Sequence, residues 1–274
     1  MKIGVFDSGL GGLIVTKALA LAFPKYDFAY LGDTANLPYG NKSADKIYEY
    51  SVGCVDYLFR EKNAGLIIVA CNTAAALALR KLQQEWLPKN FPDRRILGIA
   101  IPTLEYIAER GYKNTGLIAT NATVQSGIYD IELKKINPEI KIESRATPLL
   151  VPLIEDGGDK YAPAVLSDYL AGFEKKDALI LGCTHYPIYK DIIRKMLPNI
   201  AVVSQDEIIP DKFADYLSRH PELESKLDKN GTISFGITDM TKNYASTAAR
   251  LFGQDIKIET AVIDKRAADG RRGV

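Results

Sequence analysis

Short apolar runs alternate with longer amphipathic stretches along the chain. The stretch from Ser43 to Lys62 repeats apolar residues at three-to-four spacing, which predicts a helix with one buried face. The apolar runs predict strands at residues 2–7, 28–32, 66–71, 95–99, 115–120, 140–144, 178–183, 200–204, 232–237 and 256–263. Nearly all-apolar strands that alternate with helices are typical of a parallel sheet covered on both faces. The pattern therefore predicts an α/β fold.

The chain also contains an internal repeat. A shift of 112 residues places Gly4 on Gly116 and Cys71 on Cys183, and it overlays "IGVFDS" and "IIVACNT" on "TGLIAT" and "LILGCTH" without a gap. Chance alignment of two strands is the alternative interpretation. We expect two pseudo-symmetric lobes, each a mostly parallel sheet flanked by helices, with one thiol at the carboxyl end of a central strand. Ligands bind at that edge in open α/β sheets, so the active site is expected in the cleft between the lobes.

Two proline-bearing segments, 98–103 and 202–211, are the best candidates for breaks between the lobes. We expect lobe one to comprise residues 1–97 plus 208–274, and lobe two to comprise residues 98–207. The apolar run at 232–237 follows the second copy of the repeat, so it is expected to return to lobe one.

Composition and charge narrow the classes of partner. The chain has 274 residues, of which 47% are hydrophobic and 25% charged, and its net charge is +1. There is no lysine- or arginine-rich block to indicate nucleic-acid binding, and no apolar run approaches the ~20 residues that span a membrane. We expect no signal peptide. Three cysteines do not make a disulfide framework, which favours the reduced cytoplasm.

Cys71 and Cys183 are the first candidates for chemistry. Each ends a predicted strand and precedes a helix start, for which Thr73 and Thr184 are candidate capping residues. The positive end of a helix dipole would favour the thiolate there. The alternative is that each cysteine is only a small buried apolar residue.

Asp7 and His185 are candidate partners of these thiols. Asp7 ends the first strand, and adjacent parallel strands end at the same edge, so Asp7 is expected to approach Cys71. His185 follows Cys183 by two residues. A carboxylate and an imidazole beside thiols would tune their protonation or relay protons. A turn aspartate and a hydrogen-bonded wall histidine are the structural alternatives.

Small neutral donors gather at the same predicted edge. They lie in the loops 7–12 and 119–127 and directly after the two cysteines, and they are Ser8, Asn72, Thr73, Thr120, Thr123 and Thr184. Such an edge suits a carboxylate ligand without an arginine. The sequence has no H-E-x-x-H metal motif and no G-x-x-x-x-G-K-[ST] phosphate loop.

Two thiols on opposite sides of a cleft fit one chemistry especially well. Inversion of a carbon stereocentre by proton transfer is best served by two bases, one that removes the proton and one that returns a proton from the opposite face. A thiol suits both roles because its usual pKa of ~8.5 lies within reach of neutral pH.

The motifs "GVFDSGLGG", "LPYG", "VACNTA", "ATVQSGIY" and "LGCTHYP" resemble those of the glutamate racemase family, in the same order. The resemblance runs from Lys2 to about Phe252. It implies a cofactor-independent, metal-free isomerase that interconverts L- and D-glutamate and supplies D-glutamate for peptidoglycan synthesis, and so for cell wall biogenesis and cell shape. Members of the family often form dimers, in more than one arrangement, so a homodimer is one expectation.

The resemblance also implies roles for individual residues. Cys71 and Cys183 match the two catalytic acid/bases, and Asp7 and His185 match their helpers. The matched substrate contacts are Asp7, Ser8, Tyr39, Gly40, Asn72, Thr73, Thr123, Thr184 and His185. Ala75 and Ala76 stand where the family often shows a serine after the first alanine, Ala119 stands where glycine is common, and the tail after Gly253 is longer than expected.

Two alternatives remain open from the sequence. An aspartate racemase, or another amino-acid racemase with two cysteines, would keep the chemistry and change the substrate. A non-catalytic two-lobed amino-acid binding protein is the alternative from another class, although binding alone needs no thiol at either strand end.

Overall fold

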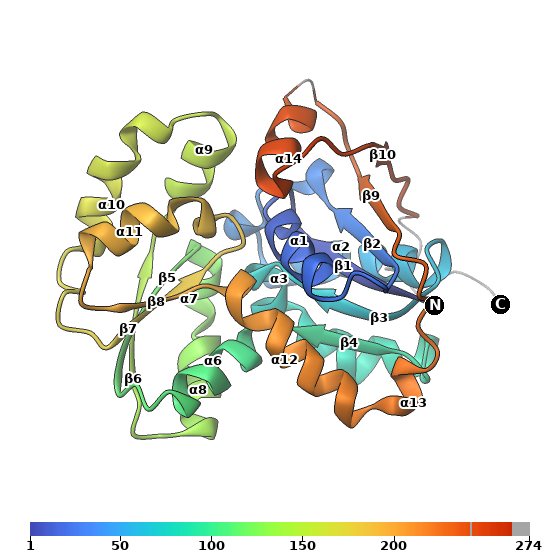
Figure 1. Ribbon diagram of the computed structural model, residues 1–274, viewed down its shortest axis with the longest axis horizontal. Helices are drawn as coiled ribbons and strands as arrows, with labels where there is room; N and C mark the ends of the chain where they lie inside the picture. The colour runs from blue at the N-terminus through green and yellow to red at the C-terminus, as the bar shows by residue number, and fades with distance from the viewer. Residues whose placement is uncertain (242, 265–274) are drawn as a thin grey trace.

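The computed structural model describes residues 1–241 and 243–264, and within these ranges its strands form two separate parallel sheets (Figure 1). The first sheet has the order β10-β9-β2-β1-β3-β4, and the second has the order β6-β5-β7-β8. The strands are β1 (Lys2–Asp7), β2 (Phe28–Gly32), β3 (Ala64–Val69), β4 (Arg95–Gly98), β5 (Asn114–Ala119), β6 (Lys141–Ala146), β7 (Ala178–Gly182), β8 (Ala201–Val203), β9 (Ile233–Ile237) and β10 (Ile258–Thr260).

Helices cover these sheets and connect their strands. In the described residues they are α1 (Gly12–Ala22), α2 (Ala44–Arg60), α3 (Asn72–Leu77), α4 (Leu79–Lys81), α5 (Leu87–Asn90), α6 (Ala100–Glu109), α7 (Asn121–Ser126), α8 (Ile128–Ile136), α9 (Leu150–Glu155), α10 (Ala162–Leu170), α11 (Lys190–Met196), α12 (Gln205–Arg219), α13 (Pro221–Glu224) and α14 (Tyr244–Phe252). Short 3-10 turns lie at Thr34–Asn36, Tyr39–Asn41, Asp159–Tyr161 and Tyr186–Tyr189, and a π-helical turn at Leu82–Trp86.

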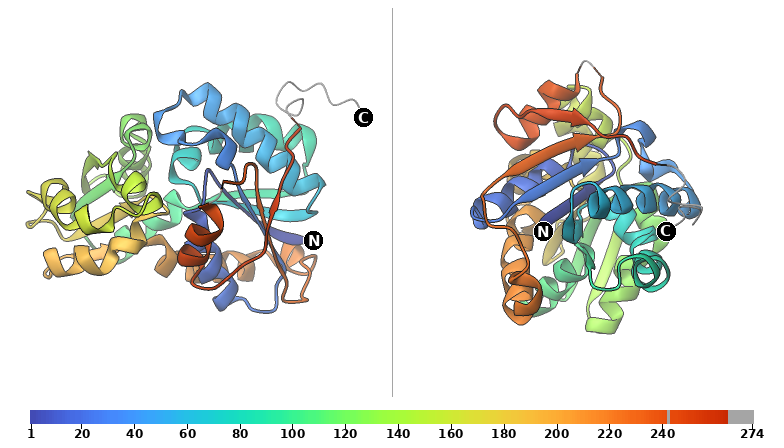
Figure 2. Two further views of the ribbon diagram at one scale, coloured as in Figure 1. Left: turned by 90° about the horizontal axis from the view of Figure 1, so that it is seen from above. Right: turned by 90° about the vertical axis from the view of Figure 1, so that its right-hand side faces the viewer.

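The repeat seen in the sequence is present in the sheets. The order β2-β1-β3-β4 of the first sheet recurs as β6-β5-β7-β8 in the second. The pairing register recurs as well, because Gly4 pairs with Ile67 and Gly116 pairs with Leu179. Figures 1 and 2 show the two sheets as separate bodies beside each other, which confirms the predicted pair of pseudo-symmetric α/β lobes.

Each predicted strand is present, with small shifts at its ends. The prediction of a helix after Ser43 is also confirmed: α2 begins at Ala44, and the Ser43 hydroxyl accepts a hydrogen bond from the Lys46 N–H. β3 is buried along its whole length, as its apolar sequence requires. The predicted strand at residues 232–237 pairs with β2 in the first sheet.

Each proline-bearing segment spans a strand-to-helix junction, and its proline lies within the helix that follows. Pro102 lies in the first turn of α6, where a missing N–H costs no hydrogen bond, and Pro210 lies inside the continuous helix α12. α12 packs against α1 on one side and α6 on the other, so it joins the two lobes (Figure 1). The division at residues 97 and 207 stays a prediction, and residues 265–274 of the proposed lobe one lie outside the described residues.

The segment after Gly253, which had no explanation from the sequence, extends the first sheet. β10 pairs with β9, and the Ala261 N–H donates to the Ile237 carbonyl at 2.7 Å. Ala261 is buried and Ile263 packs beside it against the apolar residues of α2. This segment therefore covers one side of the first lobe.

Candidate active site

A cavity of about 300 Å³ lies where the two lobes meet. Both lobes supply its walls, and many of the lining residues follow the carboxyl ends of β1, β3, β5 and β7. Nine of the site residues expected from the sequence line it: Ser8, Tyr39, Gly40, Cys71, Asn72, Thr73, Cys183, Thr184 and His185. Asp7 and Thr123 do not line it and lie buried behind its wall.

Cys71 occupies the turn between β3 and α3. Its side chain caps α3 by accepting a hydrogen bond from the Ala74 N–H at 3.4 Å. The expectation that Thr73 caps this helix is therefore wrong, because the helix is capped two residues earlier, at Cys71, and Thr73 lies inside it. The Cys71 Sγ also lies 3.2 Å from the Ser8 Oγ, so a hydroxyl from the first loop accompanies the thiol.

Burial and a nearby carboxylate favour the protonated form of Cys71. Burial raises the pKa of Cys71 to about 12, and the negative charge of Asp7 acts in the same direction. The hydrogen bond with Ser8 and the one from the Ala74 N–H lower this pKa but do not outweigh burial. The expected preference of the helix terminus for a thiolate is thus overridden by desolvation.

Cys183 lies beside His185, which in turn lies beside Glu155. The Cys183 Sγ is 3.8 Å from the His185 Nδ1, and the His185 Nε2 is 2.9 Å from the Glu155 Oε1. Burial lowers the pKa of His185, but hydrogen bonds and charge interactions with Cys183 and Glu155 outweigh it, so the pKa stands well above its usual value. The imidazole therefore lies between a sulfur atom and a carboxylate that both favour its protonated form.

Thr184 does not cap a helix. The next helical turn is the 3-10 turn Tyr186–Tyr189, which His185 precedes. The Thr184 hydroxyl instead donates to the Asp7 Oδ1 at 3.3 Å, so it bridges from the second lobe to the first.

Asp7 is fully buried at the end of β1. Its Oδ2 accepts a hydrogen bond from the Gly9 N–H at 3.1 Å. Burial raises the pKa of Asp7, although the charge of His185 and the hydrogen bonds from Gly12, Gly9 and Thr184 oppose the rise. Asp7 therefore lies behind the residues that line the cavity, and from there its negative charge raises the pKa of Cys71.

Three threonine hydroxyls form a hydrogen-bonded group across the two lobes. The Thr73 Oγ1 lies 2.9 Å from the Thr120 Oγ1 and 3.2 Å from the Thr123 Oγ1, and Thr120 and Thr123 are 3.0 Å apart. Thr73 and Thr120 line the cavity, whereas Thr123 supports them from behind. Thr123 is thus near the site but does not reach the space that a ligand would occupy.

The loop that carries Tyr39 and Gly40 is fixed by a buried carboxylate. The Tyr39 hydroxyl donates to the Asp33 Oδ2 at 2.6 Å, and the Thr238 hydroxyl donates to the Asp33 Oδ1 at 2.8 Å. Burial raises the pKa of Tyr39 well above its usual value, and Asp33 adds to the rise. The Tyr39 hydroxyl therefore remains protonated.

Gly11 and Gly40 let the lobes approach closely. A side chain at Gly11 would meet the His185 Nδ1 and the Thr184 Oγ1 at 2.5 Å, and one at Gly40 would meet the Thr120 Cβ at 3.0 Å. A Cβ at Gly11 would thus force the first loop away from the residues around Cys183.

Several cavity residues were missed by sequence reasoning. Glu155 ends α9 and Tyr244 begins α14, and Thr147, Asn121 and Tyr186 also contribute to the wall. The segment around Glu155 reads as an ordinary amphipathic helix end followed by two glycines, with no local signal of a site. Only the fold brings Glu155 to His185.

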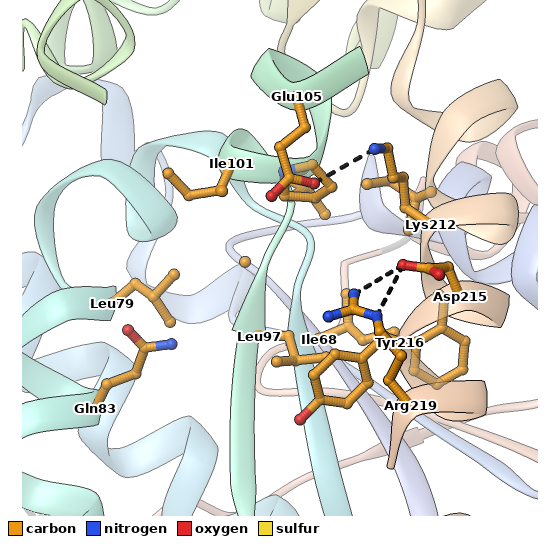
Figure 3. A pocket seen from close by; sticks show the side chains of 15 residues that line it. Ile68, Leu79, Gln83, Leu97, Ile101, Glu105, Lys212, Asp215, Tyr216 and Arg219 are labelled. Carbon is orange, nitrogen blue, oxygen red and sulfur yellow. Dashed lines mark hydrogen bonds and ion pairs between the residues drawn. The ribbon is translucent and has the colours of Figure 1, made fainter. Parts of the chain in front are cut away.

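A second cavity of about 300 Å³ lies between β4, α6 and α12 (Figure 3). Its floor is apolar, and ion pairs between Lys212 and Glu105 and between Arg219 and Asp215 lie at its rim. Neither cysteine of the first cavity lines it. Across residues 1–241 and 243–264, no three acidic, histidine or cysteine side chains are grouped as metal ligands, and no helix there is both long and apolar enough to cross a membrane.

The sequence is similar to those of known racemases. The family model for Asp/Glu/Hydantoin racemases matches residues 4–207. A glutamate racemase of Roseobacter denitrificans is 41% identical over 81% of this chain and 87% of its own length, and one of a Sulfurihydrogenibium species is 38% identical over 94% and 96%.

Solved structures agree with the sequences. The crystal structure of glutamate racemase from Francisella tularensis in complex with D-glutamate has a TM-score of 0.84 at 29% identity, and covers 96% of this chain and 97% of its own. The enzyme from Thermus thermophilus, in complex with beta-chloro-D-alanine, has a TM-score of 0.81 at 33% identity and covers 96% and 98%. An aspartate racemase from Picrophilus torridus, at 23% identity and a TM-score of 0.56, shares the fold.

The two-lobed fold and the cavity between its sheets, together with these relatives, define an isomerase of the racemase class. Within that class, the chain belongs to the Asp/Glu/Hydantoin racemase family.

Proposed function

We propose that the protein interconverts L- and D-glutamate by proton transfer at Cα, with Cys71 and Cys183 as the two acid/bases. The observation that carries this proposal is that both thiols line one cavity from opposite lobes, each with its own titratable neighbour. The relatives named as glutamate racemases support glutamate as the substrate.

The reaction needs one thiolate and one thiol in each direction. From L-glutamate, the Cys183 thiolate takes the α-proton and the Cys71 thiol gives its proton to the opposite face of the carbanion. From D-glutamate, Cys71 takes the proton and Cys183 gives one. Every turnover therefore leaves the two protonation states exchanged, and both thiols must reset before the next turnover in the same direction.

Asp7 and His185 are proposed as the helpers of these two thiols. Asp7 carries a carboxylate near Cys71, where its negative charge makes the thiolate a stronger base. His185 carries a cation near Cys183, where it stabilises the thiolate that removes the proton. The substrate is also proposed to contact Ser8, Tyr39, Gly40, Asn72, Thr73 and Thr184, with Thr123 acting through Thr73 and Thr120.

Small neutral donors make the cavity suitable for carboxylates. Hydroxyls of Ser8, Thr73 and Thr120 and the amide of Asn72 face it, and none of the residues that line it is a lysine or arginine. The proposed mechanism uses no metal, pyridoxal or nucleotide, since the side chains already provide both proton acceptors. An oxidised or disulfide-linked form would disable it, and the three described cysteines are free.

We further propose that the enzyme works in the cytoplasm, with a homodimer as its expected assembly, and supplies D-glutamate for peptidoglycan synthesis. This role follows from the resemblance of the sequence motifs to the glutamate racemase family. The family's aspartate racemases keep aspartate as the second candidate substrate.

Polarimetry separates these possibilities. Purified enzyme, dialysed without added cofactor, is incubated in parallel with L-glutamate and L-aspartate. Loss of optical rotation from glutamate alone is expected. Loss of optical rotation from aspartate alone would identify aspartate as the substrate instead. Loss from neither amino acid, in enzyme that binds glutamate, would favour the non-catalytic binding protein.

A further inference from the structure

The side chain of Asn72 belongs to a buried hydrogen-bond network that reaches across the molecule. The Asn72 Nδ2 donates to the Gln205 Oε1 at 2.8 Å, and the Gln205 Nε2 donates back to the Asn72 Oδ1 at 2.8 Å. The Tyr129 hydroxyl also donates to the Asn72 Oδ1, at 2.5 Å. Asn72 and Gln205 are each only 2% exposed, so water does not substitute for these partners.

These contacts determine which way the Asn72 amide faces. Its oxygen accepts from both Gln205 and Tyr129, and its nitrogen gives one hydrogen to Gln205. An amide nitrogen carries two hydrogens, so one donor of Asn72 remains after the network is complete. Asn72 also lines the cavity between the lobes, where a ligand carboxylate would accept that hydrogen.

Gln205 itself is placed by a long helix. It is the first residue of α12, whose later residues pack against both α1 and α6. Lys212 of this helix pairs with Glu105 of α6 at 3.4 Å (Figure 3). It also pairs with Glu109 of the same helix at 2.5 Å. The Gln205 Nε2 also lies 3.4 Å from the Thr103 Oγ1 on α6. The glutamine is therefore anchored to the second lobe while it holds a residue that follows β3 of the first.

We propose that Gln205 is a positioning residue of the racemase site, which keeps the free N–H of Asn72 directed at the substrate carboxylate. This inference rests on the proposed function. Gln205 does not line the cavity, so it acts through Asn72 and not by touching the substrate.

A hydrogen bond from Asn72 to a substrate carboxylate forms with either enantiomer and persists throughout proton transfer. Its loss weakens ground state and transition state alike, so KM rises while kcat is unchanged. Gln205→Met keeps the length of the side chain and removes both of its hydrogen bonds to Asn72. We expect KM for L- and D-glutamate to rise about 10-fold, the effect of one hydrogen bond to a charged group. Gln83→Met is the matched control, because Gln83 lies outside this cavity and bonds the Ile96 carbonyl.

Gln205→Glu provides a second readout. A protonated glutamic acid, like glutamine, both donates and accepts, whereas an ionised one can only accept. KM of this variant should approach the wild-type value at acid pH and rise as the carboxyl ionises, relative to wild type measured in the same buffers. A KM ratio to wild type that does not change with pH would overturn the inference, even if Gln205→Met fails to fold.

A double-mutant cycle tests the route through Asn72. Asn72→Ala should raise KM by itself, and Gln205→Met added to it should raise KM no further. The inference would be overturned if the two substitutions raised KM by independent factors, or if Gln205→Met kept the wild-type KM. In either case an active wild-type enzyme would still support the proposed function. Absence of glutamate racemisation in the wild type would instead remove the proposed function.

Discussion

The His185 Nε2 lies 2.9 Å from the Glu155 Oε1, and this contact joins the imidazole to a carboxylate on the side away from Cys183. Glu155 ends α9 of the second lobe, and its side chain is only partly exposed. The contact helps to raise the pKa of His185 against the opposing effect of burial. The charge state of His185 therefore depends on a residue distant in sequence.

Glu155→Gln should lower kcat about 10- to 100-fold, because a neutral amide no longer holds the imidazolium. The pKa of His185 should fall, so activity that needs the protonated imidazole should be lost at a lower pH than in the wild type. Profiles of kcat against pH for both enantiomers measure this shift. Glu174→Gln, at an exposed carboxylate, is the control, and an alkaline limb that stays in place in Glu155→Gln would contradict the assignment.

Local sequence was enough to predict the lobes and the two thiols. The all-apolar runs before Cys71 and Cys183 fix two buried strands, and parallel strands end at a shared edge. The matching registers of Gly4 and Gly116 show that the offset of 112 residues reflects real structural repetition. These features depend on patterns a few residues long.

The supporting residues could not be predicted in the same way. Glu155 and Gln205 meet His185 and Asn72 only because separate segments fold against one another, and nothing in their own neighbourhoods marks them. Whether Cys71 or Thr73 caps α3 depends on the residue at which the backbone enters the helix, which a sequence pattern does not specify. The high pKa of Cys71 depends on burial, which a sequence does not quantify.

Cys71→Ala and Cys183→Ala should each abolish racemisation, with a loss of at least about 10³-fold, because each enantiomer presents its α-proton to only one thiol. Cys54→Ala is the matched control. Cys54 is buried on α2 and does not line the cavity, so its removal should keep the activity and reduce the free energy of unfolding by about 1 kcal/mol. A folded but inactive Cys54→Ala enzyme would show that the site is assigned wrongly.

Asp7→Asn and His185→Asn should fold and lose about 10²-fold in kcat, with a larger loss in one direction than in the other. The two enantiomers have equal free energy, so kcat/KM must fall equally in both directions and the asymmetry in kcat must be matched by KM. Initial rates from each enantiomer, followed by circular dichroism, measure this. Equal kcat losses in both directions for both variants would argue against separate helpers.

The thiol of Cys71 should make the free energy of unfolding depend on pH in the alkaline range. Its pKa is about 12 in the folded protein, against 9.0 for an ordinary thiol, so the unfolded chain loses this proton first. The stabilisation is complete below pH 9, and it is lost progressively as pH rises from 9 towards 12. Cys71→Ser removes this titrating group. Between pH 7 and pH 10, the free energy of unfolding should therefore fall by about 1.4 kcal/mol less in the variant than in the wild type. Urea denaturation at the two pH values gives the difference, and identical losses would place the thiol in a wetter site.

Deuterium incorporation tests the two-thiol mechanism directly. We expect Cys71 to take the proton from D-glutamate and Cys183 to take it from L-glutamate. When L-glutamate is converted in D₂O and the reaction is stopped early, the thiol that delivers the new hydrogen has already exchanged with solvent. The D-glutamate product should therefore carry deuterium at Cα, as measured by mass spectrometry after chiral separation.

The unconverted L-glutamate in the same sample should remain largely unlabelled, because the thiol that removed the proton tends to return it to the same face. A single base that serves both faces would carry much of the original hydrogen over to the product. Early D-glutamate with substantial protium at Cα would therefore exclude two opposed thiols, however closely the motifs match the family. Extensive deuterium in both enantiomers would instead show that the abstracting thiol exchanges faster than it returns its proton.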